Sequence, residues 1–395
     1  MLDDLRSEID KIDEKIVDLI AKRIDVVKKI GDFKEKNNIA VVDKKRFGEV
    51  LEKISKQAEN RGISSDIIRD IYHKIHSYMC DIEAKNIDEK QKNKTFVRKD
   101  LSALKPYPAP VFDNDWLLLN SNENLFLDDN ENDEKINYYP HNCSVLKNRM
   151  AKFYGCNEDE ITITNGSESA IDVIVRTFCE KDEKVLVCSP TFVVYQHCAT
   201  CNGVGFVDVP LLKNDNQLDV ENILKIAEKD KIKVAFIPTP TAPLGNSLNP
   251  NDIYKLIEKM PNTLFVIDEA YTEFTENKTF IDEINKYKNV IVLRTLSKFF
   301  GMAGLRVGFV ISNPENINAI NIVKTIYPVS RLSINKVLEI FNDENKLNEI
   351  LANREKIRRE MQRTIAEIRK LPCVEKVFDS DTNFYFVILK TFKRF

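Results

Sequence analysis

The sequence predicts two parts of different fold class: an all-helical domain over residues 1–92 and an α/β domain over residues 113–395, joined by a linker and arm over 93–112. All fourteen prolines lie at or after Pro106, and only three of the eleven glycines precede residue 100. Both residue types disfavour helix interiors, so their near absence favours long helices at the start. Beyond the boundary, short apolar runs alternate with amphipathic segments, a pattern typical of a mostly parallel sheet covered on both faces.

Composition narrows the class of ligand. The 395-residue chain is 43% hydrophobic, enough for substantial cores, and its net charge is only −3. It has no basic tract interleaved with aromatic residues, which argues against nucleic acid or anionic membranes as partners and favours small molecules. The charged amino terminus and the lack of a long apolar run predict a cytoplasmic protein without a signal peptide or membrane span.

Eight cysteines are scattered through the chain, mostly within apolar text. Buried, reduced thiols are the expectation, because disulfide frameworks belong to small secreted domains. Cys198 and Cys201 have the spacing of a metal or redox pair, but no second pair completes four zinc ligands. We therefore expect no metal site.

Three helices are expected in the first domain, over residues 5–36, 43–59 and 65–92, with breaks at Asn37 and near Gly62. In the first helix, apolar residues recur every three or four positions from Leu5 to Ile30, over about seven turns. So long a helix with so narrow a stripe requires partner helices, from this chain or from a second one. The segment 88–100 reads as a charged, solvated linker.

Seven strands are expected in the second domain, with helices between them that include 167–179 and 250–259. The strands are predicted over residues 161–164, 184–188, 204–209, 233–237, 264–267, 290–294 and 307–311. In a sheet of this kind, functional residues follow the carboxyl ends of the strands.

Cations interrupt the apolar stripe of the first helix. Arg23 lies seven residues from both Ile16 and Ile30, and Lys34 falls on nearly the same face. Because buried unpaired cations are costly, an anion should meet them. Arg46 in the second helix adds a third cation, and Glu83 supplies an acid. An internal ion pair or snorkelling side chains are the alternative interpretation.

This pattern resembles the all-helical chorismate mutases of the AroQ type. The matching positions are Arg6, Arg23, Lys34, Asp43, Arg46 and Glu83. The resemblance implies that these residues bind chorismate, that Arg23, Lys34 and Glu83 promote its rearrangement to prephenate, and that two chains interlock with Arg6 reaching the partner's site. Two positions depart from the family: Phe47 stands where a Glu is usual, and Met79 where a small polar residue is usual.

The stretch "TLSKFFGMAGLRVGF", residues 295–309, carries only two charges, Lys298 and Arg306. A desolvated lysine is a candidate Schiff-base former, because burial lowers its pKa, and the arginine could hold a phosphate. Asp268 ends a predicted strand, where it could pair with a pyridinium nitrogen. The alternative is a snorkelling pair on a loop.

Two other stretches add to this pattern. "ITITNGSES" runs from a strand through Gly166 into a helix and forms an anion site at the helix start. "SPTFVVY" offers Phe192 as a stacking ring.

Together these motifs resemble the fold-type I pyridoxal-phosphate aminotransferases, most closely the histidinol-phosphate aminotransferase family. "LNSNEN", "NYYP", "DEAYTEF" and "VFDSDTNF" extend the resemblance over residues 100–390. It implies a three-layer fold and pyridoxal 5'-phosphate as cofactor. It also implies a role for each matching residue: Lys298 bonds to the cofactor and shuttles a proton, Asp268 pairs with the ring nitrogen, Tyr271 bonds the ring hydroxyl, Phe192 stacks on the ring, Gly166, Ser167, Ser297 and Arg306 bind the phosphate, and Tyr139 reaches the phosphate of a neighbouring subunit in a homodimer.

Two departures accompany this second resemblance. Ala242 stands where the family has an asparagine that contacts the ring hydroxyl. The family also continues about fifty residues past the T-N-F motif to an arginine that binds the substrate carboxylate, whereas this sequence stops at Phe395. We therefore expect an incomplete small domain.

The two resemblances together predict a bifunctional enzyme of aromatic amino acid biosynthesis. One domain would convert chorismate to prephenate, and the other would transfer an amino group from glutamate to prephenate or an aromatic keto acid. A histidinol-phosphate aminotransferase with a regulatory chorismate-binding domain is the first alternative. A non-catalytic, ligand-sensing dimer is the second.

Overall fold

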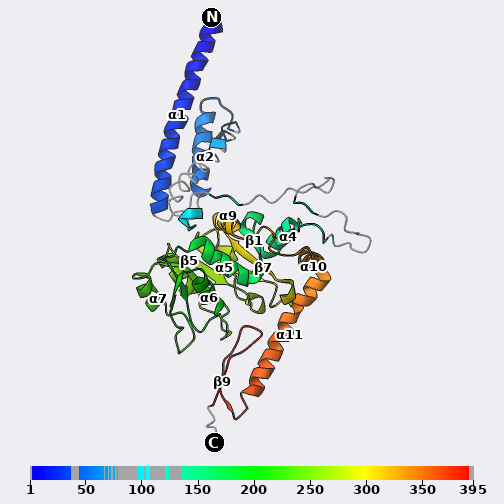
Figure 1. The fold of residues 1–395 in the computed structure, drawn as a ribbon. Coiled ribbons are helices and arrows are strands. Elements are labelled where there is room, and N and C mark those ends of the chain that lie inside the picture. Colours follow the sequence, from blue (N-terminus) through cyan, green and yellow to red (C-terminus); the bar gives the residue numbers. More distant parts are fainter. Residues whose placement is uncertain are drawn as a thin grey trace. The chain divides into compact units, whose positions relative to one another are not determined.

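The computed structural model describes residues 2–36, 44–65, 67–69, 71–72, 74–75, 78, 96–101, 104–106, 121–123, 136–141 and 143–390, with side chains in the first helix over 4–30 and in the second from 48 onward. The chain divides into two compact units, residues 1–95 and 96–395, and each is described by itself (Figure 1). Among the described residues, no helix is both long and apolar enough to cross a membrane.

The first unit is helical, as the sequence predicts. Helix α1 (Leu2–Lys36) runs for 35 residues and α2 (Lys44–Glu59) for 16, and the described positions between 65 and 78 are helical too. Ser55 and Ala58 of α2 are buried, and Arg69 Nε donates a hydrogen bond of 3.2 Å to Ser55 Oγ. The remainder of the predicted third helix, and Asp43, lie outside the described residues.

The predicted linker is not solvated along its whole length. Phe96 and Val97 pack against the core of the second unit, and Arg98 N donates to the carbonyl of Thr177 at 3.1 Å. The backbone N–H of Lys99, at the start of the short helix η2 (Lys99–Leu101), donates to Glu180 Oε1 at 2.9 Å. Two adjacent apolar residues in otherwise charged text supply the packing surface that a solvated linker lacks.

All seven predicted strands are present, in one sheet of order β1-β7-β6-β5-β4-β2-β3. They are β1 (Ile161–Asn165), β2 (Lys184–Val187), β3 (Gly205–Asp208), β4 (Ile232–Pro238), β5 (Leu264–Asp268), β6 (Val290–Thr295) and β7 (Val307–Ser312). Neighbours from β6 to β3 pair in parallel, whereas β7 is antiparallel to both β1 and β6. The sheet is therefore mostly parallel, with one reversed strand.

Helices cover both faces of this sheet and make three layers (Figure 1). One face packs on α5 (Gly166–Phe178), α6 (Val194–Cys201) and α9 (Pro314–Val323). The other packs on α4 (Cys143–Tyr154), α7 (Val220–Ala227), α8 (Pro250–Lys259) and α10 (Arg331–Asn342).

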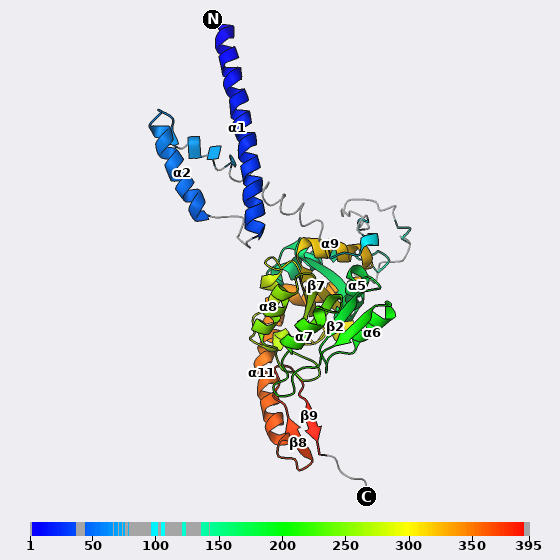
Figure 2. The same cartoon turned by 90° about the vertical axis from the view of Figure 1, so that its left-hand side faces the viewer.

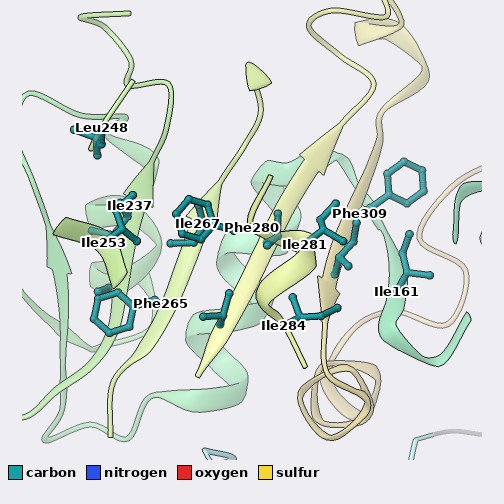
Figure 3. Packing of buried hydrophobic residues seen from close by; sticks show 14 of the residues in the cluster. Ile161, Ile237, Leu248, Ile253, Phe265, Ile267, Phe280, Ile281, Ile284 and Phe309 are labelled. Atoms are coloured by element: carbon teal, nitrogen blue, oxygen red, sulfur yellow. The ribbon is translucent and has the colours of Figure 1, made fainter. Parts of the chain in front are cut away.

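Successive strand residues alternate between the two cores, as the pleat requires. Leu264 and Val266 belong to the first core, and Phe265 and Ile267 belong to the second. Figure 3 shows the last two near Ile253 of α8. The central strands β5, β6 and β7 are buried along their whole length, so their sequences are nearly continuous apolar runs, whereas the edge strand β3 is mostly exposed.

A smaller substructure follows the sheet. Helix α11 (Glu344–Ile368) is capped by Asp343, and an antiparallel pair, β8 (Val374–Val377) and β9 (Val387–Leu389), lies beside it (Figure 2). The turn between these strands docks on the large sheet's loops: Asp381 N donates to Gly245 O at 2.8 Å, and Asp381 Oδ2 accepts from Ser247 N at 2.9 Å.

Candidate active site

One pocket lies at the edge of the sheet where the parallel strands end. Asp268 is the last residue of β5, and Lys298 follows β6. Because β7 runs in the opposite direction, Arg306, just before its start, reaches the same edge. The residues that line the pocket are Ser167, Glu168, Phe192, Tyr195, Pro238, Pro240, Ala242, Asp268, Ala270, Tyr271, Thr295, Ser297, Lys298 and Arg306.

Asp268 is the buried acceptor of this pocket, with 6% of its surface exposed. Its Oδ1 accepts from the backbone N–H of Ala270 at 3.1 Å, and its Oδ2 accepts from the Tyr195 hydroxyl at 2.7 Å. Burial raises the pKa of Asp268, while the two hydrogen bonds and the nearby Lys298 charge oppose that rise. Each carboxylate oxygen keeps a further lone pair for a ligand.

An anion cradle forms where β1 turns into α5. Gly166 has a φ of +73°, and a Cβ at this position would lie 2.6 Å from Arg306 Nη2. Arg306 itself adopts the left-handed conformation, with a φ of 54°. Its guanidinium thus lies against the start of a thirteen-residue helix, where free N–H groups and the helix dipole favour negative charge.

Gly308 allows this approach. A Cβ on Gly308 would lie 2.4 Å from the carbonyl carbon of Gly166 and 2.5 Å from Ser167 N. The pairing of β1 with β7 is therefore close enough at its end to exclude any side chain at position 308.

The expected burial of Lys298 is wrong. The sequence predicts an amine shielded from water, but Lys298 is exposed. Its neighbours Phe299 and Phe300 supply the apolar character of the stretch and are buried, at 7% and 5%. The loop turns Lys298 the other way, into the open pocket, where Nζ lies 5.5 Å from the centre of the Tyr271 ring.

A buried ion network holds the turn that carries Tyr271. Arg294 Nη2 lies 2.7 Å from Glu269 Oε2, and Arg294 Nη1 lies 2.8 Å from Glu273 Oε1. Thr279 Oγ1 and the Phe280 N–H also donate to Glu269. Since Glu269 and Glu273 flank Tyr271, this network fixes the turn on both sides.

Of the other residues predicted to contact the cofactor, Phe192 lies in the pocket and Tyr139 does not. Phe192 lines the pocket, 41% exposed, with its ring perpendicular to that of Tyr195. Tyr139 does not line the pocket of its own chain: its ring stacks on Tyr327 at 4.7 Å. Ala242 is in the pocket wall and offers no side-chain donor.

Tyr195 is one of the pocket residues that sequence reasoning missed, together with Glu168 and Thr295. It comes three residues after Phe192, and it is 1% exposed. The available signal was its position: a polar aromatic side chain at the start of the segment that follows β2, at the same edge of the sheet as Asp268.

The predicted site of the helical unit is only partly described. Arg23 is half-buried on α1, and its guanidinium lies 5.4 Å from the centre of the Tyr72 ring. Arg6 lies on the same helix, seventeen residues earlier. The side chains of Lys34 and Arg46, and residues Asp43 and Glu83, lie outside the described residues.

The described cysteines are free thiols. Cys198 is buried in α6, and burial raises its pKa to about 11; Cys201 Sγ lies 3.5 Å from His197 Nε2. Within the described residues, no group of three His, Cys, Asp or Glu side chains could hold a metal ion.

Family models match both parts of the chain. Residues 114–392 match "Aminotransferase class I and II", and residues 5–84 match "Chorismate mutase type II". The chain therefore belongs to the class I and II aminotransferases, which depend on pyridoxal phosphate, and carries a chorismate mutase domain before the transferase domain. It is an isomerase and a transferase in one polypeptide.

The relatives of this chain show which class I and II aminotransferases it resembles. Histidinol-phosphate aminotransferase of Parabacteroides distasonis is 36% identical over 302 residues, covering 74% of this chain and 83% of the relative. Histidinol-phosphate aminotransferase 2 of Idiomarina loihiensis is 32% identical over 304 residues, with 73% and 82% covered. The transferase domain is thus a histidinol-phosphate aminotransferase-like domain.

Solved structures agree on the fold. The histidinol-phosphate aminotransferase of Clostridium acetobutylicum matches with a TM-score of 0.58 and 25% identity, over 65% of this chain and 76% of that one. The Sinorhizobium meliloti enzyme, solved in complex with pyridoxal-5'-phosphate, matches with a TM-score of 0.57 and 25% identity, over 63% and 67%.

The residues present fit this cofactor. The cradle at Gly166 and Arg306 suits a phosphate, the buried Asp268 suits a ring N–H, and Lys298 opens into the same pocket. Three chemically different groups thus face one pocket, as a phosphorylated pyridine aldehyde requires.

Proposed function

We propose that the chain is a bifunctional enzyme of aromatic amino acid biosynthesis. Its helical unit converts chorismate to prephenate, and its α/β unit transfers an amino group from glutamate to prephenate or an aromatic keto acid. The observation that carries the second activity is the single pocket where Lys298, Asp268 and Arg306 face one another.

In the α/β unit, each pocket residue has a distinct task. Bound pyridoxal phosphate supplies an aldehyde and an electron-withdrawing ring. Lys298 would hold the aldehyde carbon and move a proton at the substrate Cα. Asp268 would accept from the ring nitrogen, and Tyr271 would donate to the ring hydroxyl.

The phosphate group of the cofactor would take no part in the proton transfer. Gly166, Ser167, Ser297 and Arg306 would bind it, and Phe192 would stack on the ring. These contacts orient the cofactor without taking part in proton transfer.

In the helical unit, the reaction needs no proton transfer. An arginine guanidinium can donate two parallel hydrogen bonds to a carboxylate, which suits the two carboxylates of chorismate. The site would stabilise the negative charge that develops on the ether oxygen as its C–O bond breaks. We assign the carboxylates to Arg6, Arg23 and Arg46, the ether oxygen to Lys34 and Glu83, and a binding role to Asp43. Support comes from Arg23, half-buried on a helix where a cation requires an anion.

A homodimer completes the proposal. Ile9, Ile12 and Ile16 of α1 are 57%, 50% and 49% exposed, so this part of the stripe is left open by the described residues. A second copy would cover it with the same stripe, and Tyr139 would reach the neighbouring cofactor phosphate.

The fused mutase motivates the aromatic acceptor, because its product is then consumed by the next domain. The curated relatives act instead on histidinol phosphate by name, so imidazole acetol phosphate is the second candidate acceptor.

The test compares acceptors on one preparation. With glutamate as donor, turnover is measured on prephenate, phenylpyruvate, 4-hydroxyphenylpyruvate and imidazole acetol phosphate, and chorismate loss is followed separately by absorbance. We expect the prephenate or aromatic keto acid rate to exceed the imidazole rate. The reverse order supports the histidine reaction with a regulatory helical unit. Absence of both activities, with chorismate still bound, indicates the ligand-sensing dimer.

A further inference from the structure

Tyr195 is a pocket residue that the proposed function leaves without a role. Its hydroxyl donates to Asp268 Oδ2 at 2.7 Å, and both side chains are buried. Its ring stacks on Phe236 of β4, with centres 4.7 Å apart and planes 7° apart. The hydroxyl is thus held by a rigid aromatic pair and has one carboxylate oxygen as its partner.

The two oxygens of Asp268 are held from different sides. Oδ1 accepts from the Ala270 N–H, within the turn after β5, and Oδ2 accepts from Tyr195, on α6. Two donors on separate elements fix the plane of a carboxylate, which one donor alone leaves free to rotate.

Other titratable groups face this pair as well. Lys298 is the cation that acts on Asp268, Glu269 is the adjacent anion, and Tyr271 is the other phenol near Tyr195. Burial raises the pKa of Tyr195 well above its usual value, and the Asp268 charge adds to this effect. Tyr195 therefore stays protonated, so its hydroxyl can donate to the Asp268 carboxylate.

We propose that Tyr195 is a positioning residue that holds the Asp268 carboxylate in plane for the ring N–H of the cofactor. This inference rests on the proposed function, because it needs pyridoxal phosphate in the pocket. It predicts that the Tyr195 hydroxyl contributes to recognition of the ring nitrogen and of no other part of the cofactor.

The test measures binding to cofactor-free protein and not turnover. The two ligands are pyridoxal phosphate and its 1-deaza analogue, in which a C–H replaces the ring nitrogen. Dissociation constants are measured by fluorescence quenching for wild type and Tyr195→Phe, which keeps the ring and its stacking on Phe236.

We expect Tyr195→Phe to weaken pyridoxal phosphate binding by about tenfold or more, as for loss of a hydrogen bond to a charged group. Binding of the deaza analogue should stay within about threefold of wild type.

Tyr254→Phe is the matched control. It removes another tyrosine hydroxyl from a carboxylate, Glu283 Oε1 at 3.2 Å, outside the pocket. It should change neither constant. A second comparison starts from Asp268→Asn. Adding Tyr195→Phe to that variant should not further change the ratio of the dissociation constants for pyridoxal phosphate and the deaza analogue. This comparison tests whether Tyr195 acts through Asp268 even if one variant is less stable.

Two results would overturn the inference in distinguishable ways. If Tyr195→Phe binds both ligands like wild type, or loses affinity for both equally, Tyr195 is a packing residue only. If wild type itself does not bind pyridoxal phosphate, the proposed function fails and this inference fails with it.

Discussion

The two units of the chain build their sites in opposite ways. In the α/β unit, loops from five strands meet at one edge of a sheet whose central residues, such as Phe265 and Ile267, have no exposed surface. In the helical unit, Arg6 and Arg23 lie on one helix, roughly 26 Å apart along its axis, and Ile9, Ile12 and Ile16 of that helix are about half-exposed. A sheet covered on both faces brings most of a pocket together within one chain, whereas a long amphipathic helix requires another helical surface before its cations line a site.

The comparison predicts independent chemistry, and Lys298→Ala tests this with the largest effect. Transamination should fall by at least about 10⁴-fold, because the variant has no amine to hold the aldehyde or move the proton. Chorismate turnover should stay at the wild-type rate. Both rates are measured on the same preparation, and a parallel loss of chorismate turnover would break the separation of the units.

Arg294→Met tests how far the ion network stabilises the α/β unit alone. The substitution leaves Glu269 and Glu273 buried without their cation, and we expect a loss of about 3–5 kcal/mol in unfolding free energy. Thermal unfolding should show the α/β transition shifted and the helical transition unchanged.

The stability loss of Arg294→Met should depend on pH, in a direction set by the buried Glu273 carboxyl. Burial raises the pKa of Glu273 while Arg294 opposes it, so removing the arginine raises that pKa further. A carboxyl that binds its proton more tightly when folded stabilises the fold below its unfolded pKa and loses that effect as pH rises. The variant should therefore be less impaired at pH 5 than at pH 8, and equal losses at both would contradict this account.

Arg23→Ala applies the comparison to the helical unit. Removing the guanidinium that we propose binds a substrate carboxylate should lower chorismate turnover by about 10²–10³-fold and leave transamination unchanged. Arg23→Lys is the matched variant: it retains the charge without the guanidinium and should recover only part of the loss. Wild-type turnover in Arg23→Ala would remove this residue from the site.

Gly308→Ala probes the close approach of β7 to the start of α5. A methyl group there meets backbone atoms at 2.4 and 2.5 Å, so we expect a loss of about 1–3 kcal/mol in stability and weaker cofactor binding. Gly304→Ala is the control, since no atom lies within 4 Å of its added Cβ. If chemical denaturation gives the two variants equal midpoints, the approach is not tight in solution.

Ala242→Asn should have the smallest effect, and a favourable one. It adds an amide to the pocket wall, where only Tyr271 is proposed to contact the ring hydroxyl. We expect pyridoxal phosphate to bind about two- to tenfold more tightly. Ala242→Ser, with a shorter donor, should gain less, and an unchanged constant in both variants would mean that position 242 does not face the hydroxyl.

The sequence predicted the sheet better than it predicted exposure. The central strands were found because a strand buried on both faces is a nearly continuous apolar run with polar residues at its ends. The docking of Phe96 and Val97 was missed, because two apolar residues carry too little signal within charged text. The exposure of Lys298 was wrongly predicted for a related reason: apolar neighbours such as Phe299 show that a segment is buried, but not which way the loop turns each side chain.

Prediction of the candidate site was limited in the same way, because some of its contacts join residues far apart in the sequence. Asp268 and Gly166 were found because a strand end and a strand-to-helix turn are visible in the sequence. Tyr195 was missed because its importance lies in one contact with a residue 73 positions away, and no local pattern encodes a pairing of that separation.

Lys298 and Arg306 lie on one short connection between adjacent antiparallel strands, β6 and β7. Closing so short a loop costs little chain entropy, and contacts of low sequence separation form quickly. During folding, the amine and the guanidinium should therefore come together as one local unit, ahead of the distant Tyr195 to Asp268 contact. The newly made polypeptide would therefore bring Lys298 and Arg306 together first, whereas the approach of Arg306 to Gly166, 140 positions earlier, and the Tyr195 to Asp268 contact would form later.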